Sequence, residues 1–289
     1  MEANHIEDLY TRYKPLLFSI AYKMVGTVSE AEDIVQDTFL TFFQQDLYAI
    51  QNEKAYLCKI ATNRALDLLK SSRKKREVYV GPWLPEPYLK GNGEDLLNQY
   101  LDDEQLSFTY LFMMEKLAPN ERSVFILKEG YSFKYSEIAQ ILDKTEANCR
   151  KLLERAKQKI RSKTYETTLN NGKNRDITQS FIKAFQEGKM NEVIKLMSED
   201  VILYSDGGGI VKAAIKPIYQ RDRVLAFLLG VASKLPQDFV FEQAEINGQI
   251  GLVNRVNHQT HSVICFQVDN EVMDKIYIVM NPEKLAHIK

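Results

Sequence analysis

The sequence predicts a multidomain protein in which two all-helical modules precede an α+β module. Apolar residues recur at helical spacing over residues 6–76 and again over 106–161. Runs rich in Val, Ile and Phe then follow one another from residue 239 onward, as the strands of an antiparallel meander do. Stretches that are polar or rich in Pro and Gly separate these parts. The predicted boundaries are a helical module at 1–77, a linker at 78–105, a second helical module at 106–165 and the α+β module at 174–289.

Charge is balanced over the whole chain but not locally. The chain has 38 Lys and Arg against 39 Asp and Glu. Basic residues gather at 70–76 and 150–163, and acidic residues gather at 30–37 and 94–104. A protein that binds DNA needs a basic surface only where it touches the DNA, so the near-neutral total does not exclude DNA binding.

Cysteine usage and hydropathy argue against several classes of protein. The three cysteines lie far apart and no pair has metal-ligand spacing, so we expect neither a metal site nor a disulfide framework. The N-terminus is acidic and lacks the apolar stretch of a signal peptide. The longest apolar run, 224–232, is too short to span a bilayer. We therefore expect a cytoplasmic protein with no cofactor and no membrane partner.

An acidic face marks the second helix of the first module. In EAEDIVQDTFLTFFQQ, residues 30–45, the apolar residues form a broad stripe that includes Leu40. Asp33, Gln36 and Asp37 fall three and four residues apart and so share a polar face. Such a face is either solvated surface or a docking site for a basic partner, and these residues alone favour solvated surface.

The third predicted helix, KAYLCKIATNRALDLLKSSRKKR at 54–76, ends in a basic run. Its apolar side includes Tyr56, and its other faces carry polar and charged residues. Cations at a helix C-terminus also suit the helix dipole, so the run alone indicates little. Aromatic residues beside basic ones suit a surface that holds unstacked bases, although aromatic residues are more often core.

Residues 78–105 differ in character from the helices before them. The segment GPWLPEPYLKGNGEDL, 81–96, contains three of the eight prolines, three glycines and the only tryptophan. Proline removes hydrogen-bond donors and glycine removes stiffness, so the segment is predicted to be a linker. Because an exposed indole forgoes apolar burial, Trp83 is expected to dock on another part of the chain.

The stretch 131–161 predicts two short helices joined by a tight turn. The first covers 135–142, and Thr145 is a suitable N-cap for the second. The second helix has an apolar side, which includes Cys149 and Ile160, and a cationic side. A helix–turn–helix needs this arrangement, with one face seated on the first helix and the other in the major groove. An ordinary helical hairpin with a solvated basic face is the alternative.

The last module predicts an α+β fold after a second, polar linker at 164–174. The sequence Asp206-Gly207-Gly208-Gly209 is typical of a turn. Helices followed by consecutive antiparallel strands are an α+β pattern. Helices are expected at 176–187, 190–197 and 221–234, and strands at 201–204, 239–246, 250–257, 262–268 and 272–279.

Three blocks, in order, resemble bacterial sigma-70-type factors. EAEDIVQDTFL resembles the core-binding helix of region 2, and the helix at 54–76 resembles the neighbouring helix that reads and melts the promoter −10 element. The segment LAPNERSVFILKEGYSFKYSEIAQILDKTEANCRKLLERAKQKIR resembles region 4, which reads the −35 element. Only regions 2 and 4 are present, which resembles the extracytoplasmic-function (ECF) group. The turn of the helix–turn–helix departs from the pattern, with Asp143 and Lys144 where many sigma factors have a glycine and an apolar residue.

Three further motifs resemble one ECF subgroup, the SigJ-like factors. These motifs are Trp83-Leu84-Pro85-Glu86-Pro87, Asp206-Gly207-Gly208-Gly209 and Asn281-Pro282-Glu283-Lys284-Leu285. The resemblance implies two all-α sigma domains, a region 2 helical bundle and a region 4 helix–turn–helix, followed by a SnoaL-like, NTF2-like α+β cone. It implies a transcription initiation factor, not an enzyme, that the extension regulates in cis.

The resemblance also implies roles for individual residues. The expected partners are core RNA polymerase, through its β′ clamp and β flap, and promoter DNA, with a small-molecule ligand in the cone left open. The implied residues are Asp33, Gln36 and Asp37 for the clamp; Asn63, Arg64, Asp67, Lys70, Arg73, Lys74, Lys75 and Arg76 for the −10 element; Asn148, Arg150, Lys151, Glu154 and Arg155 for the −35 element; and Trp83, Pro85, Pro87, Asp206, Gly207, Gly208, Gly209, Asn281 and Pro282 for regulation.

Two other classes of function stay open at this point. A ligand-responsive helix–turn–helix regulator that does not act through core polymerase would explain the helix–turn–helix and the cone, but not residues 30–76. An enzyme tethered to DNA would need a pocket with acid–base groups, for which Asp206, His258 and His261 are the candidates. Asp206 before three glycines is also ordinary turn chemistry, and the two histidines need not converge.

Overall fold

The computed structural model describes residues 2–46, 50–89, 107–160 and 171–288, with the side chains of 2–6, 72–77 and 171–173 left aside. The chain forms two compact units. The first comprises Met1–Glu77, Gly93–Gln105 and Leu111–Ser162, and the second comprises Val78–Asn92, Leu106–Tyr110 and Lys163–Lys289. The segment that follows residue 77 therefore belongs to the C-terminal unit.

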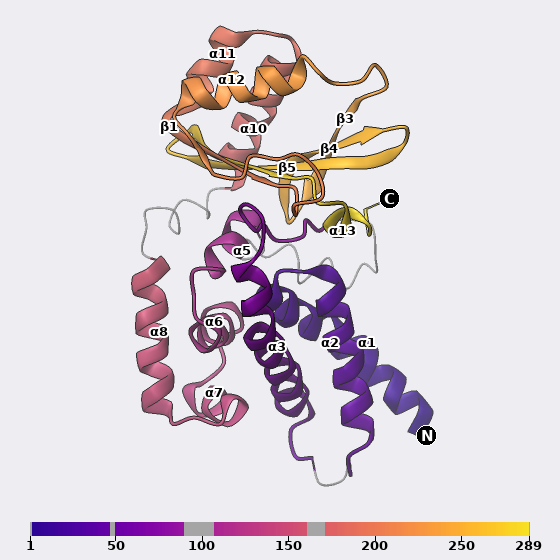
Figure 1. Cartoon of the computed structure of the whole chain (residues 1–289). Coiled ribbons are helices and arrows are strands. Elements are labelled where there is room, and N and C mark those ends of the chain that lie inside the picture. Colours follow the sequence, from indigo (N-terminus) through magenta and orange to yellow (C-terminus); the bar gives the residue numbers. More distant parts are fainter. Residues whose placement is uncertain (1, 47–49, 90–106, 161–170, 289) are drawn as a thin grey trace. The chain divides into compact units, whose positions relative to one another are not determined.

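The first unit opens with a bundle of α1 (Glu2–Val25), α2 (Val28–Phe43) and α3 (Glu53–Glu77) (Figure 1). The amphipathic stripes predicted for these helices meet in its interior. Leu17, Phe42 and Leu57 are fully buried there, and burial of such side chains drives the helices together.

The same unit continues with short helices that form the helix–turn–helix. These are the end of α5 (Phe108–Met114), whose first residues up to Tyr110 belong to the second unit, then α6 (Pro119–Phe125) with a π-helical turn over Ile126–Gly130, α7 (Tyr135–Leu142) and α8 (Glu146–Ile160). The predicted bounds of α7 are confirmed, and so is the cap of α8, because the Thr145 hydroxyl oxygen accepts a hydrogen bond of 3.2 Å from the Asn148 amide. Cys149, Leu153 and Ile160 are buried, which seats α8 as the pattern predicted.

Asp143 ends α7 in the left-handed region, with φ of 52°. A residue with a Cβ is strained there, and glycine is the usual choice at this position of a helix end. We expect Asp143→Gly to raise the free energy of unfolding by about 0.5–1 kcal/mol, since the relief of strain exceeds the added freedom of the unfolded chain. Thermal unfolding followed by circular dichroism measures the change. Asp143→Ala is the control, and a gain in stability from alanine would contradict the explanation.

The second unit contains a six-stranded sheet with strand order β2-β1-β6-β5-β4-β3. Its strands are β1 (Met197–Asp206), β2 (Ile218–Tyr219), β3 (Val240–Ile246), β4 (Gln249–Val256), β5 (Gln259–Asp269) and β6 (Val272–Val279). The antiparallel meander of β3 to β6 is as predicted. Strand β1 pairs with β6 in parallel, with Tyr204 opposite Tyr277. The sequence did not indicate this pairing, because the alternation of residues along a strand carries no information on its distant partner.

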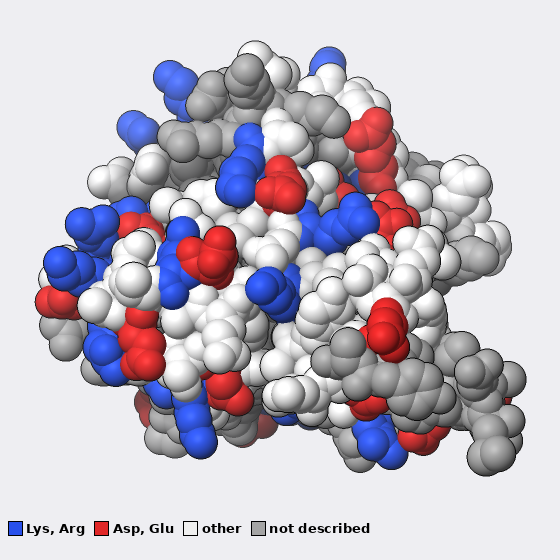
Figure 2. All heavy atoms as spheres, turned by 90° about the horizontal axis from the view of Figure 1, so that it is seen from below, with Lys and Arg blue, Asp and Glu red and all other residues white. Residues whose placement is uncertain are grey.

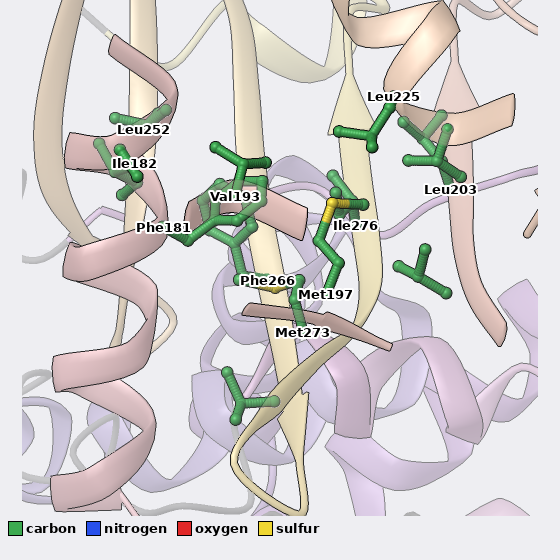
Figure 3. Close-up of a cluster of buried hydrophobic side chains, with 14 of the residues drawn as sticks. Phe181, Ile182, Val193, Met197, Leu203, Leu225, Leu252, Phe266, Met273 and Ile276 are labelled. Carbon is green, nitrogen blue, oxygen red and sulfur yellow. The ribbon is translucent and has the colours of Figure 1, made fainter. Parts of the chain in front are cut away.

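Helices α10 (Asn171–Gln186), α11 (Met190–Leu196) and α12 (Arg221–Ala232) cover one face of the sheet (Figure 1). α10 begins inside the stretch 164–174 that was predicted to be a polar linker, so that boundary was wrong. Between these helices and the sheet lies a cluster of apolar side chains, in which Phe181, Val193, Phe266 and Ile276 converge (Figure 3). The short helix α13 (Pro282–Leu285) follows β6. Over the ranges given above, no helix combines the length and the apolarity that crossing a membrane requires.

Candidate polymerase, promoter and regulatory sites

The acidic face of α2 is exposed. Asp33, Gln36 and Asp37 lie on the solvent side of the helix, while Ile34 and Val35 between them are buried. Leu40 was predicted to belong to the apolar stripe, but its side chain is 63% exposed. It follows Asp33 by two helical turns and Gln36 by one, so it extends the polar face with an apolar side chain.

The basic helix α3 places its predicted DNA-binding residues beside the same face. Arg64 pairs with Asp37 at 3.3 Å and donates a hydrogen bond of 3.2 Å to the Thr41 hydroxyl. Lys70 pairs with Asp67 at 3.0 Å. A hollow of about 310 Å³ lies along this part of the helix, lined by Tyr56, Lys59, Ile60, Asn63, Arg64 and Asp67. The side chains of Arg73, Lys74, Lys75 and Arg76 lie outside the described residues.

Every residue predicted for the −35 element is exposed on α8. These residues are Asn148, Arg150, Lys151, Glu154 and Arg155. Viewed from below, Lys and Arg side chains gather toward the α8 side, with Asp and Glu between them (Figure 2). Lys157 and Lys159 pair with Glu129 and Glu121 at 3.0 and 2.6 Å.

Within the first unit, the bundle of α1 to α3 contacts the helices α6 and α7. The Asn63 side chain donates a hydrogen bond of 3.4 Å to the Ile141 carbonyl, near the end of α7. Arg122 of α6 is 3% exposed and donates to the Met24 carbonyl at 2.5 Å, in the last turn of α1. The two modules are therefore joined by polar contacts that include a buried guanidinium.

Tyr131 makes a further connection between these modules. Its hydroxyl donates a hydrogen bond of 2.6 Å to the Ser19 hydroxyl, and the Lys23 amine lies 4.6 Å from the centre of its ring. Both partners belong to α1, so the contact adds to the one that Arg122 makes.

The second unit contains a buried carboxylate that binds residues from several segments of the chain. Asp206 is fully buried and lies 2.8 Å from the Lys284 amine. It also accepts hydrogen bonds from the Tyr79 hydroxyl at 2.6 Å, the Leu84 amide at 2.8 Å and the Gly208 amide at 3.0 Å. A buried charge is tolerated when it is paired and fully hydrogen-bonded, and Asp206 meets both conditions through residues from three separate segments.

Aromatic residues of the linker surround the Lys284 amine. It lies 4.0 Å from the centre of the Trp83 ring and 5.1 Å from that of Tyr79, and it donates to the Leu84 carbonyl. Burial, aided by the hydrogen bond to Asp206, raises the pKa of Tyr79 well above its ordinary value. Tyr79 therefore stays protonated and keeps its role as donor.

The three glycines that follow Asp206 are required because neighbouring atoms lie too close to their backbone for a larger side chain. A Cβ on Gly207 would collide with the Val211 carbonyl, and one on Gly208, at φ of 64°, would collide with the Asn281 side chain. Asn281 donates to the Tyr79 hydroxyl at 3.0 Å and caps α13 through Glu283. Gly209 has φ of 75°, and a Cβ there would press on Val80.

The rest of the linker follows the same surface. Pro85 and Pro87 are buried, Pro282 is the first residue of α13, and the Pro87 carbonyl lies 2.9 Å from the His287 ring nitrogen. Tyr88 exchanges two hydrogen bonds with Asn247, at 2.8 and 3.0 Å. The structure thus brings together all the predicted regulatory residues, which come from the linker, the turn after β1 and the C-terminal motif.

Sequence reasoning did not single out Tyr79, Asn247, Lys284 or His287. Lys284 lies in the C-terminal motif that the resemblance named, but nothing in the sequence paired it with Asp206. The other three had no signal in a single sequence, because their roles depend on contacts between segments far apart in the chain.

The structure does not gather the three acid–base candidates named from the sequence into one site of the C-terminal domain. Asp206 faces the linker, His258 is exposed in the turn between β4 and β5, and His261 is exposed within β5. The apolar cluster of Figure 3 fills the space between helices and sheet. A cavity of about 90 Å³ near Arg175 and Glu245 is smaller than the several hundred Å³ of typical ligand sites. Across the described ranges, no group of His, Cys, Asp and Glu is arranged to hold a metal ion.

Comparison with known proteins agrees with this architecture. Sigma-70 region 2 matches residues 9–75 and Sigma-70, region 4 matches residues 108–160. The chain is 31% identical to the ECF RNA polymerase sigma factor SigJ of Mycobacterium tuberculosis, over 87% of this chain and 80% of that protein. It is 26% identical to the probable ECF RNA polymerase sigma factor SigI of the same species, over 98% and 96% of the two chains.

The similarity to SigJ extends to three dimensions. The crystal structure of Mycobacterium tuberculosis SigJ matches 96% of this chain and 97% of its own, with a TM-score of 0.79 and 25% identity. The predicted combination of helical sigma domains with a C-terminal helix-and-sheet domain is therefore confirmed, and the regulator independent of polymerase is not favoured. The chain belongs to the extracytoplasmic-function sigma factors, the transcription initiation factors that bind core RNA polymerase and promoter DNA.

Proposed function

We propose that this sigma factor is restrained in cis by its C-terminal domain, which holds the linker between its two DNA-reading modules. The observation that carries the proposal is the docking of both ends of that linker on one domain. Residues 79–89 pack around Asp206, Lys284 and Asn247. At the other end, the Phe108 ring lies 5.3 Å from that of Tyr277, and Leu106–Tyr110 belong to the second unit.

The exposed face of α2 is proposed to dock on core polymerase. Asp33, Gln36 and Asp37 supply negative charge that would speed association with a basic surface and set the register of the complex. Leu40 adds an apolar contact beside them. An exposed leucine next to acids costs little in the free protein and gains burial in a complex.

Promoter reading is proposed for α3 and α8. The hollow on α3 offers an aromatic ring with amide and guanidinium donors, which suits an unstacked base of the −10 element. The exposed basic side of α8, with Arg150 near its N-terminal end, suits the major groove of the −35 element. Because Arg64 pairs with Asp37, docking of Asp37 on polymerase would release Arg64 for DNA.

The contact between the two modules does not fit simultaneous reading of both elements. Asn63 touches Ile141, which precedes Arg150 by nine residues. Nine residues span at most about 32 Å even when fully extended. The −10 and −35 elements lie roughly 25 base pairs apart, or about 85 Å on straight DNA. The modules must therefore separate before both elements are bound.

The linker determines how far they can separate. Released from the C-terminal domain, residues 78–107 could span roughly 100 Å, enough for the promoter. With both ends docked, the reach is limited by the domain that holds them. An effector would shift this balance only by binding one arrangement better than the other.

In vitro transcription with bacterial core polymerase tests the function. The wild-type chain is expected to start RNA at specific promoter sites, and Lys284→Met, which frees the linker, is expected to start more RNA from the same sites. Failure of the wild type at every site would refute promoter recognition, while unchanged output from a Lys284→Met chain shown to have a free linker would refute restraint in cis.

The docking face has its own test in a pull-down of core polymerase. Asp33→Lys combined with Leu40→Asp is expected to weaken binding by about 1–3 kcal/mol, because it reverses a charge and removes an apolar contact. Asp37 itself is unchanged, so the Arg64–Asp37 pair keeps both of its side chains. Glu7→Lys, a charge reversal at an exposed position of α1, is the matched control. Equal retention of both proteins would remove α2 from the interface.

A further inference from the structure

A tyrosine on the first helix of the helix–turn–helix contacts an arginine near the start of the second. Tyr135 is the first residue of α7 and its side chain is half-buried. The Arg150 guanidinium carbon lies 4.8 Å from the centre of the Tyr135 ring. The same guanidinium pairs with Glu146, one turn earlier on α8, at 2.8 Å. Arg150 is thus held from two sides although 56% of its side chain is exposed.

The Tyr135 ring is itself held in place. The Lys128 amine lies 5.0 Å from the ring centre and donates a hydrogen bond of 3.1 Å to the Phe133 carbonyl. The ring also lines a hollow of about 310 Å³ on this face, together with Arg150, Leu153, Glu154, Lys157 and Gln158. The ring is therefore a fixed part of the surface that α8 presents.

Fixing a guanidinium matters for reading a base. A free arginine has several rotatable bonds, and ordering them on DNA costs free energy. Its planar fork discriminates guanine from other bases only when both donors reach the two acceptors of that base. Stacking on an aromatic ring restricts the plane of the fork before DNA arrives.

We propose that Tyr135 is a positioning residue for −35 recognition, which presents the Arg150 guanidinium to a guanine edge in the major groove. The inference rests on the proposed role of Arg150. It assigns the effect to the ring of Tyr135 and not to its hydroxyl, which on the first helix could instead contact a phosphate.

The test compares full-length variants in holoenzyme on a set of promoters that carry every single-base change in the −35 element. Arg150→Ala is expected to flatten the preference at one base pair, by about 5- to 100-fold. Tyr135→Leu is expected to reduce the preference at that same base pair by about 3- to 10-fold, and Tyr135→Phe is expected to retain it. Tyr135→Gln repeats the test with a polar side chain, should Tyr135→Leu fold poorly by circular dichroism.

Each outcome decides between the explanations. Lost preference at the Arg150 base pair in Tyr135→Leu, with rescue in Tyr135→Phe, supports positioning. A uniform loss at all positions in Tyr135→Phe, with a shallower salt dependence, indicates a phosphate contact and overturns it. An Arg150→Ala effect with none from Tyr135→Leu or Tyr135→Gln also overturns it, while leaving the role of Arg150 intact. If Arg150→Ala leaves the preference unchanged, both the proposed role of Arg150 and the positioning role of Tyr135 are refuted.

Discussion

Lys284→Met should destabilise the C-terminal unit by about 3–5 kcal/mol, because it leaves the Asp206 carboxylate buried without its cation. The side chains of Asp206 and Lys284 are 0% and 7% exposed, so solvent cannot replace the lost partner. The linker should also come free, since Lys284 contacts Trp83 and Leu84. Urea unfolding of the full chain, followed by the fluorescence of its single tryptophan, measures both effects.

Two variants test whether the loss of stability in Lys284→Met comes from the unpaired Asp206 carboxylate. Asp206→Asn combined with Lys284→Met leaves no unpaired charge and should recover part of the loss. Lys189→Met breaks an ion pair in which both side chains are well exposed, and it should leave the unfolding midpoint unchanged. If Lys284→Met costs no more than Lys189→Met, the buried pair does not organise the linker.

The sequence predicted those features of the fold that depend on neighbouring residues alone, such as helix bounds, helix caps and strands. The bounds of α7, the Thr145 cap and the strands of the meander follow from helical spacing, a capping hydroxyl and alternating Val and Ile. The three motifs around Asp206 were recognised because a relative's pattern, not the chain's periodicity, connects them.

What the sequence could not predict depends on contacts between distant segments. Leu40 fits the apolar stripe of α2 by spacing, yet it stays 63% exposed in the folded unit. The parallel pairing of β1 with β6 leaves no trace in either strand. Asn63 has a side chain suited to a base, but its bond to Ile141 is visible only in the folded unit.

Arg122→Ala should lower the stability of the first unit by about 3–5 kcal/mol. The buried guanidinium pairs with Glu115 at 2.8 Å and donates to the Met24 carbonyl, so its removal leaves a carboxylate and a helix-end carbonyl without this donor. Thermal unfolding followed by the helical circular dichroism signal measures the loss. Lys159→Ala, which breaks the pair with Glu121 inside region 4, is the control and should cost less.

The contacts that Arg122 and Tyr131 make with α1 also predict an effect on transcription, which a change in stability alone would not produce. If Arg122 and Tyr131 keep the two reading modules together, loosening them should raise promoter output at temperatures where the protein stays folded. Tyr131→Phe is the milder variant, because it keeps the ring and removes the hydroxyl that donates to Ser19, a hydrogen bond worth about 1 kcal/mol. A destabilised but still closed protein would transcribe less, whereas an opened one would transcribe more. Higher output from Tyr131→Phe, but not from Lys159→Ala, would identify separation of the modules as the step that limits promoter binding.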